Sequence, residues 1–320
     1  MFHGLITKTK TKSKLFFSTL LYTKLCPNWV SGFSDAESSF SLRIVRNNTR
    51  KSGWRVLPIF AIELDRRDTI LLKRIQEFFG VGTISELNNG MVTYYVQSFS
   101  DLTQVIIPHF TKFPLLTKKR KDFILFSMAV QLLNEKAQSS VEGLQKIINI
   151  RASMNKGLPE LLNKAFPNTE PVHIPEFNVD KIYHPNWLVG FVDGEGCFYV
   201  SVKKTSSKLG NQVLLTFSLT QHSRDEMLLN CIRNYLDCGV IEKVKTRPNS
   251  VAFVVYKFSD SWGKLIPFFR IYSLQSVKLL NFNDYCEIAN LMDAKAHLTK
   301  EGIDKINLIK SQMNTGRFKK

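Results

Sequence analysis

Two glutamates stand at matching ends of a short motif that occurs twice in the chain. Residues 28–37 read Asn-Trp-Val-Ser-Gly-Phe-Ser-Asp-Ala-Glu, and residues 186–195 read Asn-Trp-Leu-Val-Gly-Phe-Val-Asp-Gly-Glu. If each segment is a helix, Glu37 and Glu195 lie at helix C-termini, where the helix dipole disfavours a carboxylate by about 0.3–1 kcal/mol. Carboxylates that face each other also repel, and a divalent cation between them removes both conflicts. The pair therefore predicts a metal site.

Glycine occupies the centre of both motif segments. Gly32 and Gly190 have no side chain, so two helix backbones can approach closely at these positions. If the two copies pair through these helices, their terminal carboxylates face each other.

The duplication extends well beyond the motif. Residues 99–101 and 258–260 both read Phe-Ser-Asp, and residues 107–110 (Ile-Pro-His-Phe) match residues 266–269 (Ile-Pro-Phe-Phe). Matching positions stay 157 to 159 apart and keep their order. Because solenoid repeats recur at roughly 20–50 residues, this long period indicates a duplicated domain.

The same order of secondary structure is predicted in each copy. After the motif helix, residues 40–44 and 56–64 carry apolar side chains at alternate positions, which is typical of half-buried strands. Asp68 and its counterpart Asp225 each precede an amphipathic run with the period of a helix, and we expect both to cap that helix. Two more strands and further helices complete each half. The predicted fold class is α+β, with antiparallel sheets whose exposed face is polar and basic.

The charge of the chain points to a polyanionic partner. Its 320 residues include 44 Lys and Arg against 27 Asp and Glu, which gives a net charge of +17 and a pI of about 9.6. Nucleic acid and an acidic membrane surface both fit this charge, as does a basic soluble protein with solvated lysines. No apolar run approaches the roughly 18 residues of a membrane helix. The five cysteines form no C-x-x-C pair, which argues against a disulfide framework and a cysteine zinc site.

Composition also divides the chain into parts. The first residues are lysine-rich and lack acids, so a transit peptide, a poor secretory signal and read-through from an upstream exon all remain open. Five prolines from Pro159 to Pro185 leave no room for a regular element, which predicts a linker. The predicted parts are a basic extension (1–26), a first half-domain (27–157), the linker (158–185), a second half-domain (186–317) and a basic tail (318–320).

The two motifs resemble the signature of the LAGLIDADG homing endonucleases. The pair is similar to the single-chain, two-repeat members found in organellar group I introns, over residues 27 to 317. The resemblance implies two pseudo-symmetric LAGLIDADG half-domains, each αββαββα, whose antiparallel sheets form a DNA-binding saddle. It also implies that the motif helices form the interface between the halves, with Asp35 and Asp193 in structural roles. Ser38 follows the first motif where the signature has glycine, and we expect a small cost because glycine suits the left-handed residue that often ends a helix.

The activity that the resemblance implies is hydrolysis of DNA phosphodiesters, with one cut in each strand. Glu37 and Glu195 would bind the catalytic metals, and the backbone carbonyls of Ala36 and Gly194 would be further ligands. Mg²⁺ is the expected cofactor, and Mn²⁺ or Ca²⁺ would be able to substitute in binding.

Two further catalytic side chains are suggested by the same resemblance. Lys257 resembles the active-site lysine of the family, although it also reads as an ordinary surface lysine on a strand. Gln221 resembles a glutamine that positions water. Their first-copy counterparts are Ser98 and Leu64, so the two catalytic centres are expected to be asymmetric.

Sequence readout is expected from the polar face of the two sheets, because paired strands fit the major groove and meet base edges there. Arg43 could hold guanine through two hydrogen bonds, and Lys208 is better suited to phosphate. The residues nominated for DNA binding are Ser41, Arg43, Asn47, Arg55, Tyr199, Ser201, Lys203, Lys208, Gln212, Thr216 and Ser218.

Other functions of the same fold remain open from the sequence. A group I intron maturase would bind intron RNA with the same basic charge and assist splicing without cutting, and an inactive remnant would keep the same pattern. The expected partner is double-stranded DNA, with intron RNA as the alternative and no membrane. Since one chain supplies both halves, we expect a monomer, and the organellar resemblance suggests the mitochondrion.

Overall fold

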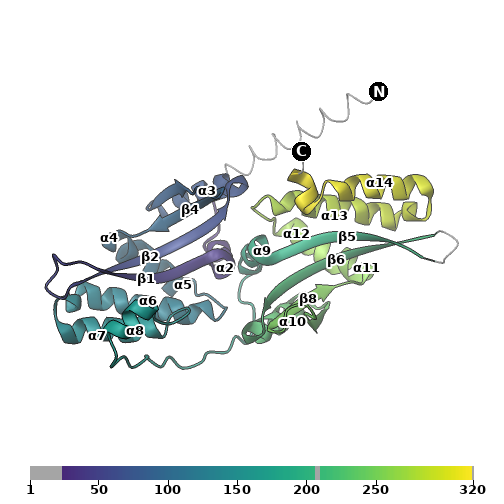
Figure 1. The fold of residues 1–320 in the computed structure, drawn as a ribbon. Coiled ribbons are helices and arrows are strands. Elements are labelled where there is room, and N and C mark those ends of the chain that lie inside the picture. Colours follow the sequence, from purple (N-terminus) through teal and green to yellow (C-terminus); the bar gives the residue numbers. More distant parts are fainter. Residues whose placement is uncertain (1–23, 206–209, 319–320) are drawn as a thin grey trace.

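The computed structural model of the protein describes residues 24–205 and 210–318, which form two similar halves side by side (Figure 1). The first half begins with a motif helix and a hairpin, continues with a helix and a second hairpin, and ends in a helical layer. Its elements are α2 (Pro27–Glu37), β1 (Ser38–Arg46), β2 (Trp54–Asp65), η1 (Arg66–Asp68), α3 (Thr69–Phe79), β3 (Thr83–Glu86), β4 (Met91–Val96), α4 (Phe99–Asp101), η2 (Leu102–Ile106), α5 (Ile107–Lys112), α6 (Lys119–Asn134), η3 (Ala137–Ser139) and α7 (Val141–Ala152).

The second half repeats that order. Its elements are α9 (Pro185–Glu195), β5 (Gly196–Lys204), β6 (Asn211–His222), η4 (Ser223–Asp225), α10 (Glu226–Leu236), β7 (Val240–Lys243), β8 (Ser250–Val255), α11 (Phe258–Asp260), η5 (Ser261–Leu265), α12 (Ile266–Ile271), α13 (Lys278–Asp293), η6 (Ala296–Leu298), α14 (Lys300–Ser311) and η7 (Asn314–Phe318). The αββαββα order predicted for each half is therefore confirmed, with short helical turns added.

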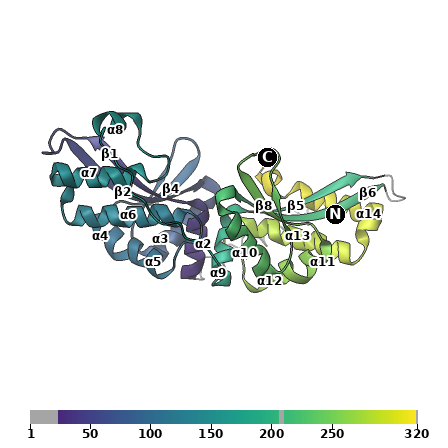
Figure 2. The same cartoon turned by 90° about the horizontal axis from the view of Figure 1, so that it is seen from below.

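Each half contains one four-stranded antiparallel sheet. The strand orders are β1-β2-β4-β3 and β5-β6-β8-β7, and the matching registers pair Phe40 with Phe60 and Phe198 with Phe217. Side chains alternate across each sheet, so one face is buried against helices and the other carries most of the exposed residues. Figure 2 shows the long helices α6 and α13 lying along their sheets.

Aromatic residues fill the core between each sheet and its helices. The ring of Phe40 lies 5.1 Å from that of Phe60 and 5.3 Å from that of Phe110. In the second half, the ring of Phe198 lies 4.8 Å from that of Phe217 and 5.6 Å from that of Phe269. Because equivalent residues make equivalent contacts, the two cores hold their sheets against their helices in the same way.

The predicted linker differs from the structure in one respect. A short helix, α8 (Glu160–Ala165), lies inside it, because Pro159 precedes the helix as its N-cap and Pro167 follows its end. The expectation of no regular element was therefore wrong for these residues. Beyond α8 the linker runs without regular structure to α9, and the side chains of Val179 and Ile182 are buried on the way.

Two predictions about the ends of the chain concern residues that the structure does not describe. Residues 1–23 of the predicted extension and residues 319–320 of the predicted tail lie outside them. Within the described part of the chain, no helix is both long enough and apolar enough to cross a membrane.

Candidate functional site

The motif helices α2 and α9 pack in direct backbone contact between the two sheets (Figure 1). A methyl group added at Gly32 would lie 1.9 Å from the carbonyl oxygen of Trp187, and one at Gly190 would lie 2.1 Å from that of Trp29. Both distances are far inside van der Waals contact, so only glycine fits at either position. The two glycines therefore set the separation of the halves, as the sequence predicted.

Asp35 and Asp193 tie this interface together. Trp187 Nε1 donates to Asp35 Oδ2 at 2.9 Å, and Trp29 Nε1 donates to Asp193 Oδ2 at 2.8 Å. Each aspartate also accepts hydrogen bonds from two backbone N–H groups and a hydroxyl in its own half, such as the Thr117 hydroxyl at 2.5 Å from Asp35. Burial raises the pKa of both carboxyls, that of Asp35 to about 6, although these hydrogen bonds oppose the shift. The structural role expected of the two aspartates is confirmed.

Glu37 and Glu195 end the two helices on the same side of the interface. Both residues are half-buried. The Glu37 carboxylate lies against the backbone of the other half, because a methyl group added at Gly194 would be 3.2 Å from its Oε1 atom. Burial raises the pKa of Glu37, the nearby Glu195 raises it further, and Lys278 and Lys119 lower it. The helix packing thus brings together the two acids that the motifs nominated.

The residue that ends each motif helix differs from expectation. Ser38 and Gly196 have φ values of −86° and −72°, so neither is left-handed and the serine is not strained. The expected cost at Ser38 was therefore wrong. Ser38 even donates its hydroxyl to the Ser34 carbonyl at 2.7 Å. Gly196 is required for space instead, since a methyl group there would lie 2.6 Å from Val192.

Two buried lysines beside the acids were missed by the sequence analysis. Lys119 Nζ donates to the carbonyls of Ser34 and Ala36 at 3.0 and 3.2 Å. Lys278 Nζ makes the equivalent bonds to the carbonyls of Val192 and Gly194, at 3.0 and 2.7 Å. Burial lowers the pKa of both lysines, and the surrounding acids oppose that shift. Their positions are 159 apart, so the repeat itself was a signal that could have found them.

The donor atoms at the helix ends suit a hard divalent cation. Glu37 and Glu195 supply carboxylate oxygens, and Ala36 and Gly194 supply carbonyl oxygens, which are the ligands that Mg²⁺ and Ca²⁺ prefer. Among the residues that the structure describes, no group of three or more His, Cys, Asp or Glu side chains could hold a metal alone. A cation here would therefore need backbone oxygens, water or a bound phosphate to complete its shell, and this pattern is typical of Mg²⁺.

The two positions predicted to assist catalysis lie in different environments. Lys257 is exposed at the N-cap of α11, just after β8. Its counterpart Ser98 is the N-cap of α4 and accepts from the Asp101 N–H at 3.4 Å. Gln221 lies on β6 in the alternation of Phe217 and Leu219, which point into the core.

Gln221 is half-buried near the end of β6, and its parity differs from that of the outward-facing residues of this strand. The outward-facing neighbour at this end of β6 is Thr220, because side chains alternate along a strand. The register partner of Gln221 on β8, Val251, is buried. The role of Gln221 in positioning water stays a prediction that this parity does not by itself support.

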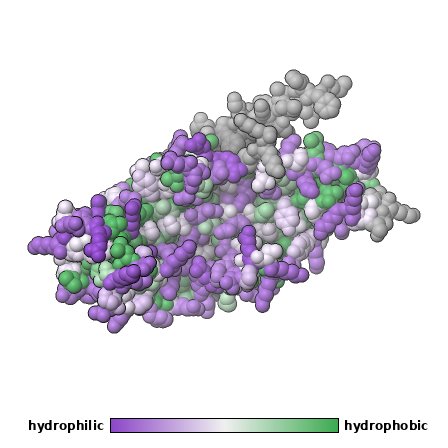
Figure 3. All heavy atoms as spheres, in the orientation of Figure 1, coloured by the Kyte–Doolittle hydropathy of each residue, from purple (hydrophilic) through white to green (hydrophobic). Residues whose placement is uncertain are grey.

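Most of the residues nominated for DNA binding occupy the outward face of the sheets. Exposed or half-buried positions on that face are held by Ser41, Arg43, Arg55, Tyr199, Ser201, Lys203, Gln212 and Ser218. In the orientation of Figure 3, hydrophilic residues predominate over the visible surface and hydrophobic ones appear in small groups. The surface is therefore suited to a hydrated, charged partner.

Two nominated residues do not follow the prediction, and a third is not tested by the structure. Asn47 lies beyond β1, where its Oδ1 accepts from the N–H and hydroxyl of Thr49 and shapes the hairpin turn. Thr216 is only 3% exposed, because its register partner is the much larger Tyr199. It is too deeply placed to meet a base edge. Lys208 lies outside the described residues.

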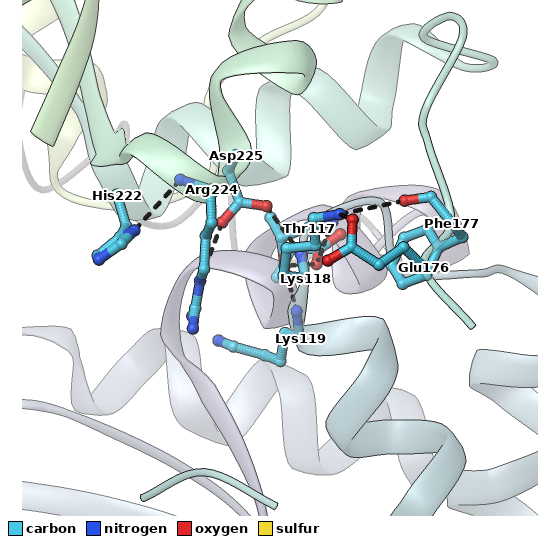
Figure 4. Close-up of polar contacts among 9 residues, drawn as sticks. Thr117, Lys118, Lys119, Glu176, Phe177, His222, Arg224 and Asp225 are labelled. Atoms are coloured by element: carbon cyan, nitrogen blue, oxygen red, sulfur yellow. Dashed lines mark hydrogen bonds and ion pairs between the residues drawn. The ribbon is translucent and has the colours of Figure 1, made fainter. Parts of the chain in front are cut away.

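A second pair of acids joins the halves in a way that the sequence did not predict. Neither Asp68 nor Asp225 caps its own helix with its side chain. Asp225 instead accepts from the backbone N–H of Lys118 in the other half at 2.8 Å, and Asp68 accepts from that of Val277. Figure 4 shows Asp225 reaching the segment that contains Thr117, Lys118 and Lys119. The expectation of local caps was wrong because the docked halves offer closer donors.

A half-buried histidine, His109, distinguishes the two halves. His109 Nε2 lies 3.2 Å from the Ser31 hydroxyl, which donates to the Phe113 carbonyl at 2.7 Å. The equivalent residues in the second half are Phe268 and Val189. Burial lowers the pKa of His109 to about 4. The imidazole is therefore neutral near pH 7 and has a structural role.

Comparison with known proteins places these features in a family. The sequence model described as LAGLIDADG endonuclease matches residues 30–130 and 188–289. A relative from Neurospora crassa, "Probable intron-encoded endonuclease 3", is 40% identical over 297 residues, which cover 92% of this chain and 55% of the relative. The chain thus spans a little over half the length of this curated relative.

Solved structures match the whole described fold. The I-SmaMI LAGLIDADG homing endonuclease bound to cleaved DNA is 42% identical, with a TM-score of 0.90 over 92% of this chain and 99% of that chain. I-SmaMI bound to an uncleaved DNA target in the presence of calcium ions is also 42% identical, with a TM-score of 0.89 over 91% and 99%. Other structures of I-SmaMI carry lysine-to-alanine substitutions.

Proposed function

The chain belongs to the LAGLIDADG endonuclease family, and on that premise we propose that it is a site-specific homing endonuclease. It makes a double-strand break in a long, asymmetric DNA target by divalent-metal-dependent hydrolysis of phosphodiesters. One observation carries the proposal: Glu37 and Glu195 end two helices that are in backbone contact between two antiparallel sheets. A duplex laid along both sheets would place one phosphodiester of each strand near this acid pair.

The sheets bind DNA through their outward faces. Two paired strands fit the major groove, so β1–β2 and β5–β6 each read one half of the target. Arg43 is exposed on β1 and has the donor geometry for guanine. Tyr199 and Lys203 lie on the corresponding outward face of β5. Because the halves differ at these positions, the preferred site is asymmetric.

The acid pair supplies the metal ligands of the catalytic centre. Glu37 and Glu195 would hold Mg²⁺ together with the carbonyls of Ala36 and Gly194. A bound Mg²⁺ would supply Lewis-acid activation of water and stabilisation of the charge that develops on phosphorus. The protein's own contribution is to fix these oxygens through the packed helices, so that the site needs little reorganisation when DNA binds.

Lys257 is proposed to assist one of the two centres. It is exposed just after β8, and an exposed ammonium group is suited to bind a phosphate. Ser98, its counterpart, is engaged as a helix cap and carries no charge. The DNA strand that is cut beside the second half-domain therefore has an additional protein cation, Lys257, near its phosphodiester.

A monomer and a mitochondrial location complete the proposal. One chain already contains both acids and both sheets, so sedimentation of the complex should show one protein per duplex. An obligate dimer would contradict this. The intron-encoded relative from Neurospora crassa supports an origin in an intron, and the organellar resemblance of the motifs favours the mitochondrion.

The decisive experiment incubates the purified chain with a randomised duplex library in Mg²⁺, with EDTA as the control. Cleavage at one discrete site, in both strands, is the expected result. Retained binding without cleavage in Mg²⁺ or Mn²⁺ would refute the nuclease proposal. Binding of structured intron RNA in place of duplex DNA would favour a maturase.

A further inference from the structure

We propose that the first half-domain binds a small, uncharged aromatic molecule, of about the size of indole, in a groove lined mainly by η2, α5 and α6. Figure 2 shows α5 and α6 side by side. Both helices cover the buried face of the first sheet, since Phe110 of α5 and Phe126 of α6 pack on Phe40. The groove therefore belongs to the helical layer and not to the outward face of the sheet, and the inference goes beyond the proposed nuclease activity.

The size and the lining of the groove suit a small apolar ligand. Its volume is about 550 Å³, within the range of roughly 300–1,000 Å³ that is usual for small-molecule sites. Phe110, Phe123 and Val130 are buried residues of its lining. An apolar lining that faces water is stabilised when an apolar ligand covers it.

The polar part of the lining is almost free of charge. The uncharged polar side chains that line the groove are Thr103, Thr111, Ser127, Gln131 and Asn134. Among the described lining residues, Arg120 alone carries a charge, and its guanidinium lies 5.0 Å from the ring of Phe177 in the linker. Amide and hydroxyl groups can bond a ring N–H or O–H, but they offer no counter-charge. The lining therefore favours an uncharged ligand.

The second half-domain shows which chemical group covers the same surface there. Trp262 in η5 is the counterpart of Thr103, and its half-buried indole packs against the core and stacks on Phe258 at 5.9 Å. Ile266 is 1% exposed, whereas its counterpart Ile107 is half-buried. Because the two copies share one fold, we infer that the Trp262 indole covers a surface that Thr103 leaves open.

Hydrogen bonds also close the second copy and leave the first one open. Arg270 of α12 donates to the sulfur of Cys286 on α13, so a side chain spans the two helices. Their counterparts are Thr111 and Ser127. Each of these hydroxyls donates to a carbonyl of its own helix, at 2.8 and 2.9 Å. Neither side chain crosses from α5 to α6, so the groove stays accessible between them.

The test titrates the full chain with 5-fluoroindole and follows the ligand by fluorine NMR. The wild type should bind one ligand with a Kd of about 1 mM, which is an ordinary affinity for so small a ligand. Thr103→Trp should weaken binding by about 10-fold or more, because the new indole occupies the groove. Val141→Trp is the control. Val141 is 75% exposed on α7 and does not line the groove, so this variant should bind as the wild type does.

Two more variants test the comparison of the copies. Thr111→Arg with Ser127→Cys copies the bridge of the second half and should weaken binding by about 3-fold or more, since it spans the groove. Thr111 is exposed, so the new arginine needs no space in the core. Trp262→Thr with Arg270→Thr should open the equivalent groove, and the number of ligands bound per chain should rise from one to two.

Three outcomes would overturn the inference. One is the absence of saturable binding by the wild type, and another is an equal Kd in Thr103→Trp and Val141→Trp. The third concerns charge: if indole-3-acetate bound about 10-fold more tightly than indole, Arg120 would hold a carboxylate and the ligand would not be of the uncharged class. The titration needs neither DNA nor metal, so a failure of the nuclease proposal would leave its result unchanged.

Discussion

Replacing Gly32 with alanine is expected to push the two halves apart. The added methyl group would lie 1.9 Å from the Trp187 carbonyl oxygen, 2.8 Å from its carbon and 3.0 Å from the backbone nitrogen of Phe191. All three atoms belong to the backbone of α9, so no side chain can rotate away. Reaching an ordinary contact of 3.4 Å requires α2 and α9 to separate by about 1.5 Å at this point.

The free-energy cost of this clash is partly offset by the higher helix propensity of alanine. Overpacking a close interface typically costs about 1–3 kcal/mol, whereas alanine stabilises a helix by about 0.8–1 kcal/mol over glycine. We expect Gly32→Ala to lower the free energy of unfolding by up to about 2 kcal/mol after both effects. Cleavage should suffer more, because a shift of about 1 Å between reacting groups can cost roughly 100-fold in rate. The separation moves Glu37 relative to Glu195.

The assay pairs urea unfolding with single-turnover cleavage of the preferred target. Gly263→Ala is the control, since a methyl group at Gly263 in η5 would meet nothing within 4 Å. The control should keep wild-type cleavage and, with no clash to offset the helix propensity of alanine, gain up to about 1 kcal/mol in stability. If Gly32→Ala matched Gly263→Ala in both measurements, the backbone contact between α2 and α9 would be refuted as the feature that sets the acid pair.

Three further predictions concern the acids, the histidine and the readout surface. Glu37→Gln or Glu195→Gln should slow double-strand cleavage by roughly 100-fold or more while target binding is largely kept. Gel assays of cleavage and of binding measure the two effects, and undiminished cleavage by either variant would show that the assignment is wrong. The folded pKa of His109 is about 4 against 6.5 for the free group, so the unfolded chain binds the proton first and stability falls as pH drops from 6.5 towards 4, by up to about 3 kcal/mol. Ser31→Val with His109→Phe, which copies the second half, should remove that dependence in urea unfolding at several pH values, and an unchanged pH profile would contradict it. Arg43→Ala should cost about 1–3 kcal/mol at the preferred site and relax one base pair, whereas a base-preference profile identical to the wild type would remove Arg43 from the recognition set.

The order of elements and the acid pair were predictable because both are written in local patterns. The repeat marked two equivalent halves, and the alternation around Phe40 and Phe198 predicted strands that the structure contains. The motif predicted two helices ending at Glu37 and Glu195. The alternation of side chains between two faces is a property of the strand backbone. It therefore holds whichever residues pack against the strand.

The alternation of side chains gave the wrong exposure where a neighbouring side chain covers the residue. Thr216 has the parity of a readout residue but is covered, because Tyr199 stands beside it on the adjacent strand. Gln221 was assigned by likeness of a short segment, and it is half-buried with the parity of Phe217 and Leu219. A side chain's face follows from the sequence, but its access to solvent depends on the sizes of residues that are distant along the chain.

The sequence by itself determined the duplication, the class of fold, the motif helices and the acids at their ends, because each depends on residues close together in the chain or on the comparison of two copies. Only the tertiary structure decided which groups meet between the halves. Asp225 bonds the N–H of Lys118 rather than its own helix, and Lys119 and Lys278 turn inward to the helix ends. These contacts join residues about 80 to 110 positions apart, and hydrogen bonds of this kind form only when packing has brought donor and acceptor within 3.5 Å and excluded the water that would otherwise compete.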